Sequence, residues 1–402
     1  MKITTNFEVL IKDCTLILIV DNMDFRLTEE QLAVRDAAKD FAQNMCKPGV
    51  IERDTNQQVP IEQLKQLGEL GFMGMMVDPK YGGSGMDTVS YVLAMEEISK
   101  IDASVSVAMS VNNSLVCWGL EQFGTEEQKQ KYLIDLATGN KIGAFCLSEP
   151  EAGSDATSQR TTAIDKGDHY LLNGTKNWIT SGSTASTYIV IAQTDVDKGH
   201  KGINAFIIER GMEGFIVGAK EDKLGIRGSD THTLLFNDVK VPKENRIGED
   251  GFGFKFAMKT LSGGRIGIAA QALGIASGAY EISLAYSKER ETFGKPICEH
   301  QIIQFKLSKM ALDIEAARML VLKAAWHKDE HMDYNTSGAM AKLMASQVAM
   351  ETTVEAVQIH GGYGFVKEYH VERLMRDAKI TQIYEGTSEI QNIVIARSIL
   401  KG

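Results

Sequence analysis

The chain has 402 residues, which exceeds what one hydrophobic core comfortably fills, so two or three structural layers or domains are expected. Hydrophobic residues make up 44%, as is usual for a soluble globular protein, and the formal net charge is -10 without a basic run, which argues against a nucleic-acid or anionic-membrane partner. The five cysteines are scattered and form no Cys-x-x-Cys pair, which argues against a zinc site or a disulfide framework and favours a reducing compartment.

Residues 1–22 are unusual because the stretch from Phe7 to Val20 is mostly apolar. Lys12 and Asp13 interrupt it, and it is too short to span a bilayer. It has neither the basic leader nor the small-residue cleavage site of a signal peptide, nor the composition of a transit peptide. We interpret it as a poorly packed extension or an upstream start, with the folded protein beginning near Met23. We expect a cytoplasmic bacterial protein without stable membrane insertion.

Residues 23–141 have the pattern of a helical domain. The stretch from Thr28 to Gln31 reads as a capping box, and apolar residues follow at helical spacing. Thr125 to Gln128 resembles a second capped helix start. Further helices are expected over 61–70, 88–101 and about 104–123.

The apolar period changes between residues 142 and 248. Short β-rich runs lie at 170–172, 188–192, 205–208, 215–217 and 233–236, separated by Asn-Gly, Lys-Gly and Asn-Asp turns. This pattern predicts an antiparallel sheet or a small barrel. Residues 249–402 return to the helical period, with long segments at 266–290, 301–327 and 339–360.

The predicted fold class is therefore α+β and multidomain, with an N-terminal α-helical domain, a middle antiparallel β domain and a C-terminal helical bundle. No strand leads through Gly-x-Gly-x-x-Gly into a helix, and no Walker sequence occurs, so Rossmann and P-loop folds are excluded.

One stretch near the C-terminus suggests chemistry. Gly386 follows Glu385 and lets backbone pass close to a ligand, because glycine has no Cβ. Thr387 and Ser388 then precede a new helix, whose first turn has unpaired N–H groups suited to an anion. A carboxylate beside such a helix start suggests acid–base chemistry on a charged substrate, although a solvated Glu-Gly turn would look the same locally.

Six segments together resemble the acyl-CoA dehydrogenase family, at 81–85, 109–115, 147–155, 177–180, 264–269 and 384–391. The resemblance runs from about Met23 to the C-terminus, and it is nearest to short-chain (butyryl-type) members, with short branched-chain members next. It implies a homotetramer of subunits that end in a four-helix bundle. It also implies FAD held between domains and across a subunit contact.

The resemblance implies a cofactor site assembled from separate segments. Along the flavin and its pyrophosphate it implies Phe145, Cys146, Leu147, Ser148, Gly153 and Ser154, and against the flavin ring Trp178, Ile179 and Thr180. For the pyrophosphate and adenosine of a neighbouring subunit's FAD it implies Arg290, Thr292, Phe293, His300 and Gln301, and under the diphosphate Gln358, Ile359, His360, Gly361 and Gly362. Thr387, Ser388 and Glu389 complete the set. The structural alternatives are a surface turn, a core tryptophan, an exposed helix arginine and a plain Gly-Gly helix stop.

Glu385 is the catalytic base that the resemblance implies. The residue before Arg265 is the catalytic glutamate in isovaleryl and long-chain branches, but here it is Gly264. Where glutaryl-type members carry an arginine this chain has Ser106, which disfavours a dicarboxylic substrate. The implied substrate contacts are Ser154, Leu261, Ser262, Arg265, Tyr384 and Gly386.

The implied reaction is α,β-dehydrogenation of a short-chain acyl-CoA to the trans-2-enoyl-CoA. Glu385 removes the α-proton, flavin N5 takes the β-hydride, and an electron transfer flavoprotein accepts the electrons. An exposed carboxylate is too weak a base for a C–H bond, so we expect the site to raise the pKa of Glu385 by excluding water. The alternatives are a 2-methyl-branched substrate, an acyl-CoA oxidase, a non-catalytic flavin-binding relative and a helical structural protein without cofactor.

Overall fold

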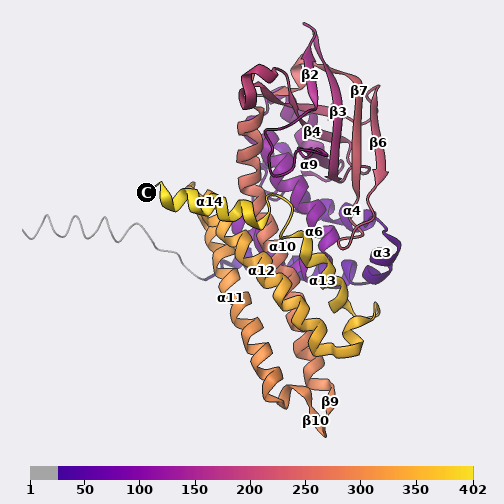
Figure 1. Ribbon diagram of the computed structural model, residues 1–402, viewed down its shortest axis with the longest axis vertical. Coiled ribbons are helices and arrows are strands. Elements are labelled where there is room, and N and C mark those ends of the chain that lie inside the picture. Colours follow the sequence, from indigo (N-terminus) through magenta and orange to yellow (C-terminus); the bar gives the residue numbers. More distant parts are fainter. Residues whose placement is uncertain (1–25, 402) are drawn as a thin grey trace, which may run out of the picture.

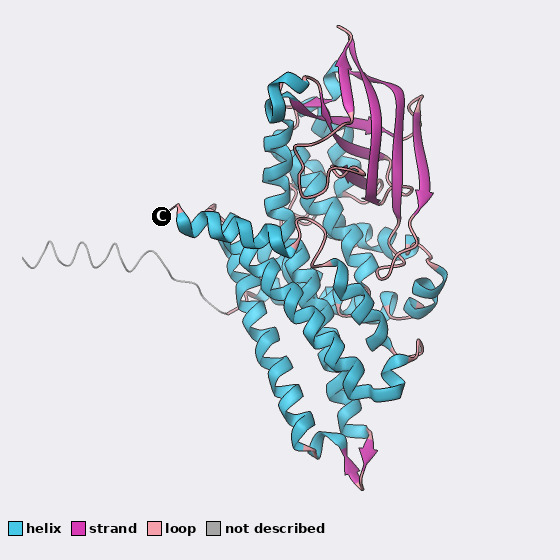
Figure 2. Ribbon diagram, viewed as in Figure 1, coloured by secondary structure: helices cyan, strands magenta, loops and turns pink. Residues whose placement is uncertain are grey.

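The computed structural model describes residues 26–401 (Figure 1), so the prediction for residues 1–22 lies outside the described residues. A β domain lies at one end of the molecule, and a bundle of long helices extends away from it (Figure 2). Shorter helices from the N-terminal part of the chain pack between and behind the β domain and the helical bundle (Figure 1). The predicted order of a helical, a β and a second helical part is confirmed.

The N-terminal part is helical. Its α-helices are α2 (Glu29–Phe41), α3 (Val50–Asn56), α4 (Ile61–Glu69), α5 (Thr88–Ser99), α6 (Ala103–Ser110), α7 (Trp118–Phe123), α8 (Glu126–Gln128) and α9 (Ile134–Ala137). Both predicted capping boxes are present, with Thr28 and Thr125 each accepting a hydrogen bond from the backbone N–H three residues on. A π-helical segment, Val111–Cys117, joins α6 to α7, and every residue of α6 is buried.

The middle part is a sheet of eight strands. They are β1 (Gly143–Cys146), β2 (Thr162–Asp165), β3 (His169–Thr180), β4 (Thr187–Gln193), β5 (Ile203–Glu209), β6 (Phe215–Lys220), β7 (Thr231–Pro242) and β8 (Arg246–Ile247). The order is β6-β7-β3-β2-β4-β5-β8, and β1 pairs with β4. Most pairings are antiparallel as predicted, whereas β4 runs parallel to β1 and to β2. Buried aromatic side chains such as Tyr188, Phe206 and Phe236 form a core of its own for this sheet.

The C-terminal part consists of α10 (Gly253–Glu289), α11 (Gln301–Asp329), α12 (Asn335–His360), α13 (His370–Ile380) and α14 (Ser388–Leu400). Helix α10 has 37 residues, a length of roughly 55 Å. It reaches from the β domain to the far tip of the bundle, where β9 (Glu291–Thr292) and β10 (Lys295–Pro296) form a hairpin (Figure 1). The two ends of α10 therefore belong to different regions of the molecule.

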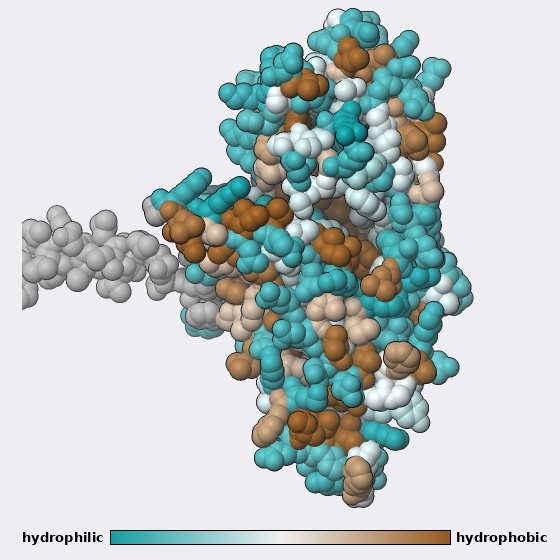
Figure 3. Space-filling view, in the orientation of Figure 1, coloured by the Kyte–Doolittle hydropathy of each residue, from teal (hydrophilic) through white to brown (hydrophobic). Residues whose placement is uncertain are grey.

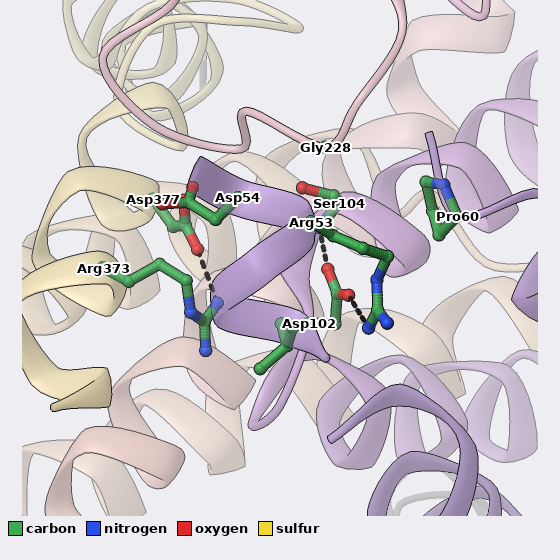
Figure 4. A pocket seen from close by; sticks show the side chains of 9 residues that line it. Arg53, Asp54, Pro60, Asp102, Ser104, Gly228, Arg373 and Asp377 are labelled. Atoms are coloured by element: carbon green, nitrogen blue, oxygen red, sulfur yellow. Dashed lines mark hydrogen bonds and ion pairs between the residues drawn. The ribbon is translucent and has the colours of Figure 1, made fainter. Parts of the chain in front are cut away.

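A buried cluster of charges joins the three parts (Figure 4). On α13, Asp377 pairs with Arg373 at 2.9 Å and accepts a hydrogen bond from the backbone N–H of Ile226, which precedes β7. Arg376 on α13 reaches α3, where it pairs with Asp54 at 2.7 Å. These contacts fix α13 against the N-terminal helices and the β domain, and thereby fix the start of the segment that carries Glu385.

Candidate active site

Glu385 lies in the short connection between α13 and α14. Its φ is 51° and that of Gly386 is 94°, so two consecutive residues adopt the left-handed conformation, which is unfavourable for glutamate. Thr387 caps α14 by accepting a hydrogen bond from the backbone N–H of Ile390, which confirms the predicted helix start. Because both ends of the connection are held by helices, the Glu385 side chain is aimed in a defined direction.

The carboxylate of Glu385 points against the wall of α10. A Cβ placed on Gly264 would lie 2.1 Å from Oε2 of Glu385 and 2.7 Å from Cδ2 of Leu115, so only glycine fits there. Oε2 is buried, and no residue among 26–401 gives it a hydrogen bond. Burial raises the pKa of Glu385 to about 7, and Lys342 and Arg265 oppose that rise. The expected rise in pKa is therefore confirmed, and it suits a general base.

Two cations stand beside this carboxylate. Arg265 on α10 is buried, and its Nη1 donates to Oδ1 of Asn335 at 2.8 Å. Burial lowers the pKa of Arg265, and the charge of Glu385 opposes this effect. Lys342 on α12 is also buried, and its ammonium group donates to the carbonyl of Gly386. Arg265 was predicted as a site residue, whereas Lys342 was missed.

A chain of hydrogen bonds supports Tyr384, the residue before Glu385. The hydroxyl of Tyr384 donates to Oε1 of Gln271 on α10. Nε2 of Gln271 donates in turn to the carbonyl of Ala103 at 2.9 Å and to Oγ of Ser106 at 3.2 Å. Ser106, at the place of the glutaryl-type arginine, is buried and uncharged, and it also accepts a hydrogen bond from Ser99 at 2.8 Å. This part of the site therefore holds a neutral network.

The loop after β1 is held by a buried ion pair that the sequence reasoning did not identify. Lys176 on β3 has no exposed surface, and its Nζ lies 2.7 Å from Oε1 of Glu149. It also donates to the carbonyl of Leu147 at 3.0 Å and to Oε1 of Gln159 at 3.2 Å. A backbone hydrogen bond from Asn177 to Ser148, 2.9 Å long, ties the loop to β3. The segments around Ser148 and Trp178 are thus brought together.

Trp178 and the open glycine of the loop fit a planar cofactor. The Trp178 side chain is 56% exposed, and its φ is 59°. A Cβ on Gly153 would meet nothing within 4 Å, and Ser154 is exposed beside it. Cys146 and Ile179 are buried in the core of the sheet, and Phe145 and Leu147 belong to the larger core, so these four can offer only backbone groups. An exposed aromatic side chain beside open backbone can accept a planar ring system such as a flavin.

The second group of predicted cofactor residues lies elsewhere, at the far tip of the bundle. There the Nε2 of His300 donates to the carbonyl of Thr292 at 3.2 Å, and Phe293 is 97% exposed. His360 stacks on Tyr286 with ring centroids 4.1 Å apart, and Arg290 lies over the ring of Tyr363. Arg290 and Arg265 are separated by roughly 37 Å of α10. One chain does not bring both groups to one place.

Several predicted residues have more local roles. Gln358 and Ile359 belong to the last turns of α12 rather than to a loop, and His360 ends the helix with its Nδ1 donating to the carbonyl of Ala356. Gly361 and Gly362 have open space where a Cβ would stand. Of the remaining predicted residues, Thr180 and Leu261 are half-buried, and Gln301 and Glu389 are exposed. The hydroxyl of Ser262 donates to the carbonyl of Met258, and that of Ser388 donates to the carbonyl of Gln382.

Within residues 26–401, no helix is long and apolar enough to cross a membrane. No set of three or more His, Cys, Asp or Glu side chains in that range is arranged to hold a metal ion.

The fold is that of a three-domain enzyme with a β domain between two helical domains. The acyl-CoA dehydrogenase N-terminal, middle and C-terminal domains match residues 28–140, 144–239 and 251–400. A short-chain specific acyl-CoA dehydrogenase from Clostridium acetobutylicum is 51% identical over 379 residues, which are 94% of this chain and 100% of that relative. The chain therefore belongs to the acyl-CoA dehydrogenase family of oxidoreductases, as its motifs predicted, and members of this family are flavoproteins.

Two solved structures are similar throughout. Butyryl-CoA dehydrogenase from Megasphaera elsdenii has a TM-score of 0.93 and 52% identity, and the match covers 94% of this chain and 100% of that chain. A chain in a structure named for the electron transferring flavoprotein of Acidaminococcus fermentans, in work on electron bifurcation, has a TM-score of 0.94 and 52% identity with the same coverage.

Proposed function

We propose that this protein is a short-chain acyl-CoA dehydrogenase that uses FAD and Glu385 to form trans-2-enoyl-CoA. The observation that carries the proposal is the buried carboxylate of Glu385, whose Oε2 has no hydrogen-bond partner within residues 26–401. A base that already had a strong partner would have to break that contact before it could accept a proton. This oxygen is free to take the α-proton of a thioester placed beside Gly264.

Different residues of the chain are proposed to bind the substrate and to transfer the proton. Glu385 accepts the α-proton, and the backbone N–H of Glu385 is the proposed donor to the thioester carbonyl, which stabilises the charge that develops there. Arg265 and the residues around it bind the rest of the substrate, and the tightly packed α5, α6 and α10 exclude water. When FAD is bound, it accepts the β-hydrogen as a hydride. An electron transfer flavoprotein is the proposed acceptor of its electrons, and a structure named for such a protein contains a chain similar to this one.

A short, uncharged acyl chain is the proposed substrate. Ser106 and Gln271 fill the neighbouring space with a neutral hydrogen-bond network, and a carboxylate buried there would need a cation beside it. The matched relatives are named for short-chain and butyryl substrates. A 2-methyl-branched substrate is the second candidate, because one methyl group changes binding by only about 1–3 kcal/mol.

A homotetramer is the proposed assembly. The cofactor residues at the tip of the bundle lie far from Trp178 in the same chain, so one FAD could contact both groups only with the help of a second copy. The exposed apolar side chains Phe293 and Phe365 near the tip and Leu400 on α14 need partners, and Figure 3 presents apolar patches at the tip and around α14.

The test is an anaerobic titration of the purified holoenzyme. We expect a yellow protein whose flavin is bleached fastest by butyryl-CoA, compared in separate samples with isobutyryl-, 2-methylbutyryl-, isovaleryl-, hexanoyl- and octanoyl-CoA. Fastest bleaching by a branched or longer substrate would overturn the chain-length assignment, rapid peroxide formation in air would identify an oxidase, and a protein that cannot be reconstituted with FAD would overturn the function.

A further inference from the structure

A lysine lies buried behind the proposed base, and neither the motifs nor the implied mechanism use it. Lys342 lies in the third turn of α12, with alanines before and after it, and has no exposed surface. Lysine is almost never fully buried unless its ammonium group has a partner. Here the ammonium group donates a hydrogen bond to the carbonyl of Gly386, which directly follows Glu385.

The carbonyl of Gly386 is held from two sides. The second donor is Nε2 of Gln391 in the first turn of α14, at 2.8 Å. Glu385 and Gly386 both have positive φ, and such a conformation persists in a non-glycine residue only where surrounding contacts fix it. Lys342 and Gln391 supply those contacts, from α12 and α14 respectively.

Of the two donors, Lys342 can carry a positive charge and Gln391 cannot, so only Lys342 affects the pKa of Glu385 by its charge. Lys342 and Arg265 face the carboxylate from α12 and α10, while Tyr91 on α5 and the adjacent Tyr384 contribute neutral hydroxyls. Glu389 is the other acidic group that acts on Lys342. Burial lowers the pKa of Lys342 to about 7 and raises that of Glu385 to about 7, and each charge favours the charged form of the other.

We infer that Lys342 is a positioning residue of this active site, which fixes the Glu385–Gly386 turn through the Gly386 carbonyl and keeps the Glu385 carboxylate in its charged, proton-accepting form. Gln391 shares the first task but not the second, because its amide is neutral. Arg265 does not replace Lys342, because its guanidinium donates to Asn335 and not to the Gly386 carbonyl. This inference rests on the proposed function, since it assumes that Glu385 is the base.

The experiment measures the rate of anaerobic flavin reduction by butyryl-CoA between pH 5.5 and 9. In the wild type, the rate falls as the pH decreases through the pKa of Glu385. In Lys342→Met we expect the midpoint of this fall to move up by at least one pH unit, so that the rate near pH 6.5 drops about tenfold more than the rate near pH 9. Lys342→Arg should keep the midpoint, because it retains the charge. Should Lys342→Met fail to hold FAD, Lys342→Gln gives the same test.

Two control variants separate charge from position. Gln391→Leu removes the neutral donor and should lower the rate equally at every pH. Lys328→Met removes a half-buried lysine, whose neighbouring charges are Asp329 and Glu121 rather than Glu385, and should leave the midpoint unchanged. An unshifted midpoint in Lys342→Met would overturn the inference while leaving the proposed function intact. Normal flavin reduction in Glu385→Gln would instead overturn the proposed function.

Discussion

Asp377 and Glu385 stand eight positions apart, and their carboxylates have different surroundings: Asp377 is fully buried, whereas Glu385 is half-buried with its Oε2 atom buried. Burial raises the pKa of Asp377 to about 6 and that of Glu385 to about 7. Asp377 is paired with Arg373 at 2.9 Å and also accepts a backbone hydrogen bond from Ile226, whereas Oε2 of Glu385 has no partner within residues 26–401. Burial by itself therefore does not identify a base. The unpaired oxygen, held beside Gly264 and two cations, distinguishes the proposed base from the structural carboxylate.

The largest effect is expected from breaking the structural pair. Arg373→Met leaves Asp377 buried without its guanidinium partner, and we expect the free energy of unfolding of the holoenzyme to fall by about 3–5 kcal/mol in denaturant titrations. Lys141→Met, which removes an exposed pair with Asp135, should change it by less than about 1 kcal/mol. A loss below about 1 kcal/mol in Arg373→Met would mean that Asp377 does not depend on its partner.

The next effect concerns the space beside the proposed base. Gly264→Ala would place a methyl group 2.1 Å from Oε2 of Glu385, so the carboxylate must move, and we expect turnover to fall about 100-fold, or about 2.7 kcal/mol, with FAD still bound. Gly263→Ala is the matched control on the same helix, because the nearest atom to its Cβ is Nζ of Lys328 at 4.0 Å. We expect that variant to keep turnover within about twofold. Equal effects in the two variants would contradict the assigned position of Glu385.

A smaller effect, of opposite sign for the two carboxylates, is expected in stability. The pKa of Glu385 rises from 4.5 to about 7 on folding, so the folded protein keeps a proton that the unfolded chain loses in this range. The resulting destabilisation is absent below about pH 4.5, grows as the pH rises and is complete above about pH 7. Glu385→Gln should therefore stabilise the holoenzyme by about 1–2 kcal/mol at pH 8 and by less at pH 5.

Asp377→Asn is the paired variant for this stability measurement. Burial raises the pKa of Asp377 to about 6, so its charge also costs some stability above that pH. Asp377→Asn in addition leaves the buried guanidinium of Arg373 without its counter-charge, and we expect that loss to be larger, so the protein should be destabilised at pH 8. Thermal unfolding of both variants at the two pH values tests the contrast. A loss of stability in both variants at pH 8 would mean that Glu385, like Asp377, is a structural carboxylate.

The sequence predicted the fold well because its signals are local. The capping boxes at Thr28 and Thr125 and the start of α14 at Ser388 depend on residues close in sequence, and all three are confirmed. The parallel pairing of β1 with β4 was not predicted, because it joins strands far apart in the chain. The sequence of one strand does not show which distant strand it pairs with, or in which direction.

The site was predictable only in part, because some of its residues act through contacts between segments that are far apart in the sequence. Glu385 and Arg265 stand in recognisable motifs, whereas Lys342 and Lys176 act through contacts with distant segments. A lysine at an apolar position of a helix, such as Lys342 in α12, was the available signal. Its partner could not be named from sequence, because the Gly386 carbonyl carries no side-chain signature.

The proposed role of Glu385 as the base is best tested by anaerobic stopped-flow measurement of flavin reduction in the Glu385→Gln holoenzyme by butyryl-CoA at pH 8. We expect the variant to retain FAD and its flavin spectrum to shift when acyl-CoA binds. Flavin reduction should be at least about 1,000-fold slower than in the wild type, because only the proton acceptor has been removed. Reduction within about tenfold of the wild-type rate would contradict the assignment of Glu385 as the base.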